Sequence, residues 1–249
     1  MSALLASVRS LHEARIALAA GVDVIDLKEP AEGALGAVSL TVARLVAALP
    51  DRPTVSATIG DLPFVADAVV PAARAMAATG VDIVKIGVFD GPVAATLAAL
   101  KPLSAEGMRL VAVMFADRAP DFSILPRLKK AGFQGAMLDT ADKTAGGLRH
   151  HCPDRHLRAF VAAARRAELL CGLAGSLSIS DIAPLAALGP DYLGFRGALC
   201  ARGRADALDP ARLESVRQAL RRAASTATAT AGRQRATSSR RAPVALKIV

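Results

Sequence analysis

The stretch GVDIVKIG at residues 80–87 shows the pattern that recurs along the whole chain. A glycine and an aspartate come first, a short β-branched run follows, and an Ala- and Leu-rich segment with helical spacing comes next. Glycine at such a step ends a helix in a left-handed conformation, and the chain then turns into a buried strand. Similar steps occur at Gly21, Gly132 and Gly189. The pattern therefore predicts helices that alternate with buried strands.

Eight strands are expected, at residues 4–8, 22–28, 54–59, 82–87, 110–115, 134–139, 169–174 and 191–196. Helical segments are expected to begin near residues 11, 40, 65, 92, 124, 155, 179 and 213. Such alternation predicts right-handed βαβ units and a parallel sheet. Eight units in a chain of this length predict a single α/β domain, a (β/α)8 TIM barrel, over residues 1–224. An open doubly wound sheet is disfavoured because no glycine-rich dinucleotide fingerprint follows the first strand.

The net charge of +9 is concentrated at the C-terminus. Residues 221–249 hold seven basic side chains and no acidic one, which leaves +2 for residues 1–220. Residues 225–249 have little apolar periodicity, so we expect a basic, disordered tail after the barrel. A tail of this kind could bind nucleic acid, and that alternative predicts salt-dependent binding that disappears when the tail is removed.

Composition excludes several other classes of protein. No apolar run is long enough to span a membrane, and the first residues do not resemble a signal peptide. Three cysteines without a C-x-x-C pair are typical of a reducing, cytoplasmic protein. With no Trp and one Tyr, stacking on single-stranded nucleic acid is not expected. The Ala-rich outer helices would permit close packing between subunits, so a homo-oligomer is expected.

Charged side chains gather at the carboxyl ends of the even-numbered strands, where the chemistry of TIM barrels takes place. Lys28, Lys85, Asp139 and Arg196 occupy these ends, and Asp26 has the inward parity of Lys28 one layer deeper. Two neighbouring ammonium groups disfavour each other's protonation, and burial has the same effect. A lysine with a lowered pKa can attack an aldehyde and form a Schiff base. The residues alone therefore indicate carbonyl chemistry of the class I aldolase kind, with Asp139 orienting or neutralising the lysines.

A phosphate site is expected after strands seven and eight, as in other barrels. Gly175 and Ser176 follow the seventh strand, and Arg196 and Gly197 end the eighth. The alternative is that Gly175 and Ser176 only turn the chain and cap the next helix. The third strand contributes further candidates for substrate binding, namely Ser56, Thr58 and Asp61.

No metal site and no cofactor are expected. His150, His151 and Cys152 are adjacent in sequence, and adjacent side chains rarely bind one ion with good geometry. Cys200 follows the eighth strand and is expected to be a small buried residue.

The ordered strand-end motifs resemble the (5-formylfuran-3-yl)methyl phosphate synthase family of methanofuran biosynthesis. The resemblance spans about residues 3–220. It rests on these segments: DLKEP at 26–30 with GALGA at 33–37, SATIGD at 56–61, VKIG at 84–87, MLDTA at 137–141 with Lys143, LAGS at 173–176, and RGA at 196–198.

This resemblance implies that two glyceraldehyde 3-phosphate molecules condense to 4-(hydroxymethyl)-2-furancarboxaldehyde phosphate, with loss of one phosphate and two waters. It implies a lyase in which Lys28 forms the Schiff base and Lys85 accepts a proton. Asp26, Asp139 and Lys143 match positions that line such a site. Lys143 and Arg9 are candidates for a second phosphate site. In a bacterium, such an enzyme would serve one-carbon metabolism. The alternative is another Schiff-base aldolase, or an isomerase, acting on triose or sugar phosphates.

Overall fold

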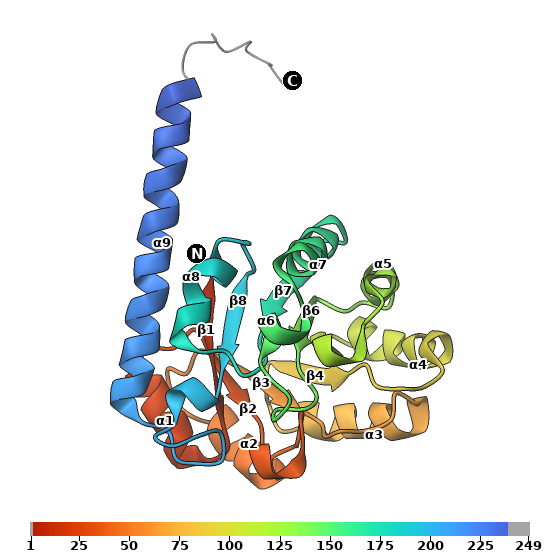
Figure 1. Cartoon of the computed structure of the whole chain (residues 1–249). Helices are drawn as coiled ribbons and strands as arrows, with labels where there is room; N and C mark the ends of the chain where they lie inside the picture. Colours follow the sequence, from red (N-terminus) through yellow and green to blue (C-terminus); the bar gives the residue numbers. More distant parts are fainter. Residues whose placement is uncertain (1, 239–249) are drawn as a thin grey trace, which may run out of the picture.

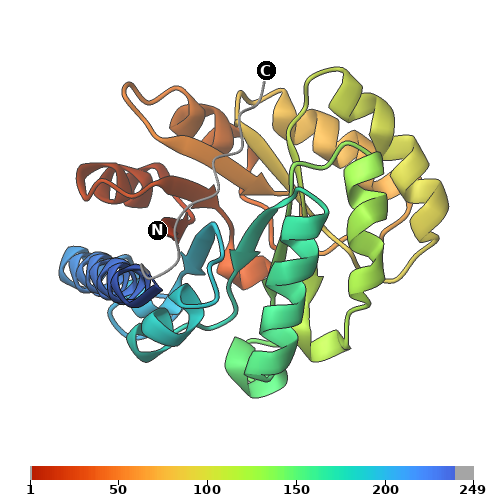
Figure 2. The same cartoon turned by 90° about the horizontal axis from the view of Figure 1, so that it is seen from above.

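The computed structural model describes residues 2–238, with side chains up to residue 226. Eight parallel strands form a closed barrel in the order β1 to β8, each paired with its neighbours in sequence and β8 paired with β1. Figure 2 shows the helices arranged around the ring of strands. The predicted (β/α)8 barrel is confirmed. The strands are β1 (Ala3–Val8), β2 (Val24–Leu27), β3 (Thr54–Thr58), β4 (Ile83–Gly87), β5 (Leu110–Phe115), β6 (Gly135–Asp139), β7 (Leu170–Leu173) and β8 (Tyr192–Phe195).

Helices follow each strand and cover the outside of the barrel (Figure 1). They are α1 (Leu11–Ala19), α2 (Leu40–Ala47), α3 (Ala66–Ala77), α4 (Val93–Ala105), α5 (Leu125–Lys130), α6 (Leu148–His151), α7 (Asp154–Arg166), α8 (Ile182–Ala186) and α9 (Pro210–Ser238). Short 3-10 turns lie in the loops: η1 (Pro30–Glu32), η2 (Ala116–Arg118), η3 (Phe122–Ile124), η4 (Ile179–Asp181) and η5 (Gly197–Leu199).

Each glycine–aspartate step leads from a helix into the next strand at the amino-terminal end of the barrel, and its aspartate bonds to the strand before. Gly80 has a φ of +90°, which turns the chain out of α3 as the sequence predicts. The carboxylate of Asp82 then accepts the N–H of Val55 in β3 at 2.7 Å. Asp23 and Asp191 accept N–H groups of the preceding strands over the same distance. Each step therefore ends a helix and fixes the start of a neighbouring strand.

Apolar side chains form two clusters because successive strand residues point to opposite faces of the sheet. The larger cluster lies between the strands and the helices and includes Ile25, Val55 and Ile86. The smaller cluster includes Val111, Val113, Phe115 and Met137, the inward residues of β5 and β6. Charged side chains, by contrast, lie at the carboxyl ends of β2, β4 and β6.

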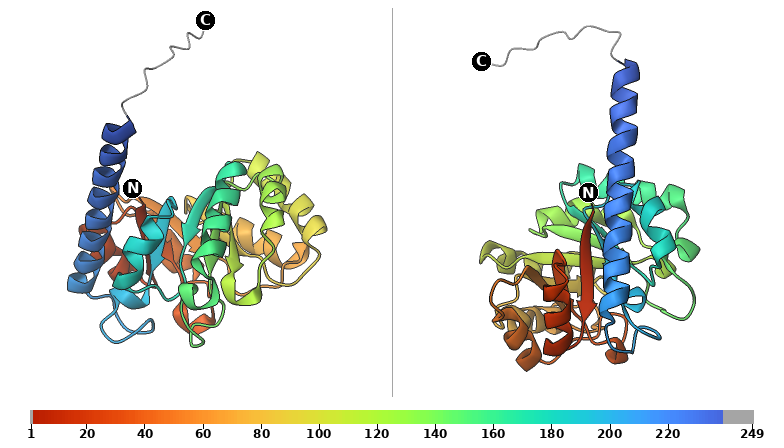
Figure 3. Two further views of the ribbon diagram at one scale, coloured as in Figure 1. Left: turned by 45° about the horizontal axis from the view of Figure 1, so that its top comes forward. Right: turned by 90° about the vertical axis from the view of Figure 1, so that its left-hand side faces the viewer.

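The C-terminal helix differs from the sequence prediction. Disorder was expected from residue 225, but α9 continues to Ser238, so the expected boundary at residue 224 falls within it. Ala and Arg favour helix, which accounts for this extension. The Ser225 and Thr226 hydroxyls, which would otherwise disfavour helix, donate to carbonyls four residues earlier, at 3.1 and 3.0 Å. The rest of the expected tail, residues 239–249, lies outside the described residues. Figures 1 and 3 show α9 running antiparallel to β1 and projecting beyond the amino-terminal end of the barrel.

Within residues 2–238, no helix has both the length and the apolar character that crossing a bilayer requires.

Candidate active site

A cavity of about 610 Å³ opens at the carboxyl ends of the strands. Its charged lining residues come from distant parts of the chain and meet only because the barrel closes. They include Asp26 and Lys28 of the β2 end, Lys85 of β4, and Asp139 of β6. These four residues are at most 7 % exposed. The sequence prediction that they converge is therefore confirmed.

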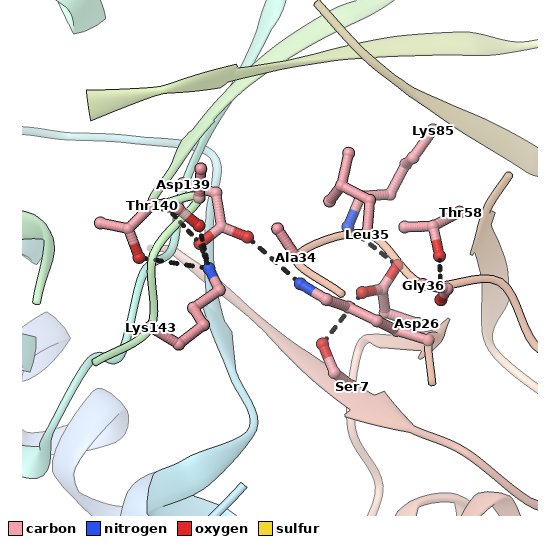
Figure 4. A network of polar contacts seen from close by, with 12 residues as sticks. Ser7, Asp26, Ala34, Leu35, Gly36, Thr58, Lys85, Asp139, Thr140 and Lys143 are labelled. Atoms are coloured by element: carbon pink, nitrogen blue, oxygen red, sulfur yellow. Dashed lines mark hydrogen bonds and ion pairs between the residues drawn. The ribbon is translucent and has the colours of Figure 1, made fainter. Parts of the chain in front are cut away.

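One charged group is centred on Asp26. The Lys85 ammonium donates to its Oδ1 at 2.9 Å. The Ser56 hydroxyl donates to the same oxygen at 2.6 Å, and the Ser7 hydroxyl donates to Oδ2 at 2.9 Å. Figure 4 shows Asp26 lying between Ser7 and Lys85. This carboxylate therefore binds a single ammonium and is oriented by two hydroxyl groups.

A second charged group is centred on Asp139. The Lys28 ammonium lies 3.4 Å from its Oδ2, and Lys143 donates to Oδ1. Lys143 also bonds to the carbonyl and hydroxyl oxygens of Thr140, and the Thr140 N–H donates to Asp139 at 2.8 Å (Figure 4). The Asp139 carboxylate therefore forms ion pairs with two ammonium groups.

This arrangement shifts the pKa of Lys28. The Lys28 pKa is lowered to about 8. Burial is the largest cause, Asp139 opposes it, and the ammonium groups of Lys143 and Lys85 add to the lowering. Burial acts on Asp139 in the opposite sense and raises its pKa. Lys28 and Lys143 outweigh that effect, so the pKa of Asp139 falls far below its usual range. At neutral pH, a carboxylate thus faces a lysine that readily gives up its proton.

Backbone groups next to these lysines have the geometry of an anion site. Gly175 and Ser176 line the cavity with φ values of +111° and +47°. Neither N–H donates to another group within the described residues. Gly197 also lines the cavity. Unpaired backbone N–H groups that line a cavity can donate to an anion, so the position is compatible with a phosphate.

Arg196 was expected to bind phosphate; it lines the cavity, but its guanidinium is already bonded to protein groups. Its N–H groups donate to the carboxylate of Glu13 in α1 and to the carbonyl of Ser7. The others donate to the carbonyls of Arg204 and Asp206, both at 2.8 Å. All five N–H donors are used, so Arg196 supports the loop after β8 and has none left for a ligand.

Two other predicted substrate ligands support a loop. The Asp61 carboxylate accepts the N–H groups of Ala34 and Leu35 at 2.7 and 2.6 Å. The Thr58 hydroxyl donates to the carbonyl of Gly36 at 3.0 Å. Neither Asp61 nor Thr58 is among the cavity-lining residues, and Ser56 reaches the site only through Asp26. Ser56 and Thr58 of β3, and Asp61 after it, therefore position Asp26 and the β2 loop through these hydrogen bonds.

No metal centre is evident in the described part of the chain. Residues 2–238 contain no group of three or more His, Cys, Asp or Glu side chains arranged to hold an ion. Cys152, Cys171 and Cys200 are free and buried.

Ser7, Glu13 and Arg204 are among the cavity or support residues that were not predicted from the sequence. Ser7 lies next to the end of β1 without a charge to mark it, and Glu13 has the i,i+4 spacing to Arg9 of an ordinary surface pair. Arg204 lies in a loop with no strand-end signal. Strand parity could have identified Ser7, but the other two depend on contacts with residues far away in the sequence.

The buried charges at the strand ends define a TIM-barrel enzyme. The chain belongs to the 4-HFC-P synthase family, whose model matches residues 4–217. A Methylorubrum extorquens relative with the provisional name (5-formylfuran-3-yl)methyl phosphate synthase is 44 % identical over 221 residues, or 88 % of this chain and 91 % of the relative. The (5-formylfuran-3-yl)methyl phosphate synthase of Methanococcus aeolicus is 35 % identical and covers 80 % of this chain and 91 % of its own length.

Solved structures of other barrel enzymes resemble this one in fold. Phosphoribosyl anthranilate isomerase from Thermus thermophilus superposes with a TM-score of 0.63 at 15 % identity, covering 88 % of this chain and 98 % of its own. A 3-hexulose-6-phosphate synthase superposes with a TM-score of 0.61 at 20 % identity, covering 88 % of this chain and 99 % of its own. At these identities the similarity shows the shared fold alone.

Proposed function

We propose that this protein condenses two glyceraldehyde 3-phosphate molecules into 4-(hydroxymethyl)-2-furancarboxaldehyde phosphate through a Schiff base on Lys28. The two substrates together lose one phosphate and two waters, which balances the product. The names of the relatives support a furan phosphate as product. The product would enter the biosynthesis of methanofuran or an analogue of it.

The observation that carries the proposal is the environment of Lys28. Its amine lies in a cavity, buried, with a pKa lowered to about 8, so a substantial neutral fraction exists at physiological pH. Attack on the substrate aldehyde and loss of water give a protonated Schiff base. This cation acidifies the neighbouring carbon, and removal of a proton there gives an enamine that can expel phosphate.

Lys85 is the proposed proton acceptor for that step. Lys85 accepts the proton as a neutral amine, and the ammonium that this forms lies 2.9 Å from the Asp26 carboxylate, which stabilises it. Loss of phosphate leaves an enol whose terminal carbon can add to C2 of the second triose phosphate, once that molecule has isomerised from aldehyde to ketone. Loss of two waters then closes and aromatises the ring. Asp139 and Lys143 lie beside Lys28 and can stabilise the charges that change during these steps.

The test is reductive trapping. Glyceraldehyde 3-phosphate with borohydride is expected to add a covalent mass to the Lys28 peptide, detected by mass spectrometry. Lys28→Ala removes the amine and is expected to abolish both trapping and furan formation. Lys129→Ala is the matched control, since Lys129 is an exposed lysine on α5. Full trapping in Lys28→Ala would show that another residue forms the imine.

Product analysis separates this function from another aldolase or isomerase on the same barrel. With glyceraldehyde 3-phosphate as sole substrate, the proposed reaction generates ultraviolet absorbance from the furan and releases one inorganic phosphate per product. An aldolase or isomerase acting on sugar phosphates would give neither signal.

A further inference from the structure

The loop that joins β8 to α9 has a fixed shape. A β-bridge pairs Cys200 with Leu208, and the Asp209 N–H donates to the carbonyl of Leu199 at 2.8 Å. The loop is thus a closed hairpin at the carboxyl end of the barrel, beside the start of α9 (Figure 1).

A buried ion pair between Arg196, which follows β8, and Glu13 of α1 supports this hairpin. The side chains of Arg196 and Glu13 are 9 % and 4 % exposed and pair with each other. The same guanidinium binds the carbonyl oxygens of Arg204 and Asp206 in the loop. Burying such a pair is costly unless its remaining donors are satisfied, and here the loop carbonyls satisfy them. The backbone of Arg204 is therefore fixed in position.

The side chain of Arg204 projects from this fixed backbone to the cavity. It is half-buried and lines the cavity together with Lys28 and Asp139. Its Nη2 donates to the carbonyl of Gly33 at 3.0 Å. This hydrogen bond connects the loop after β8 with the loop after β2. That carbonyl is the only partner of Arg204's five N–H donors within residues 2–238, so the rest of the guanidinium fork is available.

Arg204 also differs from the buried cations around it. Lys28, Lys85, Lys143 and Arg196 each lie within ion-pair distance of a carboxylate. In the described part of the chain, Arg204 has no such partner. Burial is the largest influence on its pKa and lowers it, while Asp139 and Asp61 act from a distance to raise it. A partly desolvated guanidinium without a carboxylate partner is stabilised by a bound anion, which supplies the opposite charge and the hydrogen-bond acceptors.

We propose that Arg204 binds the phosphate of a triose phosphate in this cavity, as an anion site additional to the Gly175–Ser176 turn. The inference rests on the proposed function, because condensing two triose phosphates requires two phosphate groups to be held. A planar guanidinium can bind two phosphate oxygens at once. The residues first considered for a second phosphate are less suitable. Lys143 is bound to Asp139 and Thr140, and Arg9 pairs with Glu13 and does not line the cavity.

The binding test uses glycerol 3-phosphate, which has a phosphate but no carbonyl and cannot form a Schiff base. Calorimetric titration of the full chain is expected to show binding, weakened at least about tenfold in Arg204→Ala. Arg202→Ala is the matched control, since Arg202 lies two residues away in the same loop, is 88 % exposed and pairs with Asp206. Its affinity is expected to stay within about twofold of the unmodified chain. The proposal is overturned if the unmodified chain does not bind, if Arg204→Ala binds normally, or if both variants weaken equally.

A second readout separates phosphate binding from support of the loop through Gly33. In Arg204→Ala, trapping of glyceraldehyde 3-phosphate on Lys28 is expected to need at least about tenfold more substrate. Trapping of unphosphorylated glyceraldehyde is expected to be unchanged. Equal losses with both aldehydes would mean that Arg204 only supports the loop, which overturns the proposal.

The two proposals fail in different ways. If no furan forms and no adduct is trapped, while glycerol 3-phosphate binding still depends on Arg204, the proposed function is wrong and the anion site stands. If furan forms and the KM of Arg204→Ala is unchanged, the function stands and the anion site is wrong.

Discussion

The two charged groups at the strand ends use the same residue types in different proportions. Around Asp26, one carboxylate faces one ammonium, and two serine hydroxyls complete its hydrogen bonding. Around Asp139, one carboxylate is shared by the ammonium groups of Lys28 and Lys143. The first group is balanced in charge, and the second carries one positive charge in excess when both lysines are protonated.

This difference gives the two buried lysines, Lys28 and Lys85, different surroundings in one cavity. In the group with excess charge, releasing a proton relieves repulsion, and burial adds to the effect, so the pKa of Lys28 falls to about 8. In the balanced group, the Asp26 carboxylate is fixed by three donors, and Lys85 is held in one orientation. These differences are the basis for the roles proposed above, Lys28 as nucleophile and Lys85 as proton acceptor.

Removing the shared carboxylate is expected to have the largest effect. Asp139→Asn leaves two buried ammonium groups without a partner, and breaking a buried ion pair costs about 3–5 kcal/mol. Asp26→Asn leaves one, so the free energy of unfolding is expected to fall more in Asp139→Asn. Urea denaturation at pH 7 measures both variants. A larger loss in Asp26→Asn would contradict the unequal sharing of charge.

The pH dependence of trapping tests the excess charge directly. Only the neutral amine attacks an aldehyde, so the trapping rate is expected to rise with pH and level off above a midpoint of about 8. Lys143→Met removes a charge that lowers the Lys28 pKa, so its midpoint is expected to lie at higher pH. Lys85→Met removes a weaker influence of the same sign and is expected to move the midpoint less. Cyanoborohydride trapping at a series of pH values gives all three midpoints, and a downward move in Lys143→Met would contradict the interpretation.

The smallest effect is expected from loss of one hydroxyl in the balanced group. Ser56→Ala removes a 2.6 Å hydrogen bond to the Asp26 carboxylate, and such bonds to charged groups contribute about 1.5–3 kcal/mol. Denaturant titration is expected to show that loss. The trapping midpoint of Lys28 is expected to stay where it is, since Asp26 has the weakest influence on it. A moved midpoint would show that the two charged groups are coupled more tightly than their contacts indicate.

The fold and the centre of the site are predictable from the sequence because both depend on strand periodicity. Parity along each strand places Lys28, Lys85 and Asp139 at the same end of the barrel, where the structure has them. Each glycine–aspartate step marks a strand start because the glycine conformation and the aspartate hydrogen bond are both local.

The rest depends on long-range contacts. Arg196 has the position of a ligand, but Glu13, far away in sequence, takes up its guanidinium. Glu13 is 3 % exposed, although its helical spacing to Arg9 is that of a surface residue. Arg204 enters the cavity from a loop whose shape is set by Arg196 and by the bridge between Cys200 and Leu208. None of these positions follows from a periodic pattern.

The course of α9 has a practical consequence. Arg212, in its first turn, lines the cavity, and the helix then runs along the barrel and past the opposite end (Figure 3). Its 29 residues span about 43 Å. A bead, sensor surface or fusion partner attached beyond α9 would therefore lie on the side away from the substrate entrance. Immobilisation through this helix would present the open cavity to the solution.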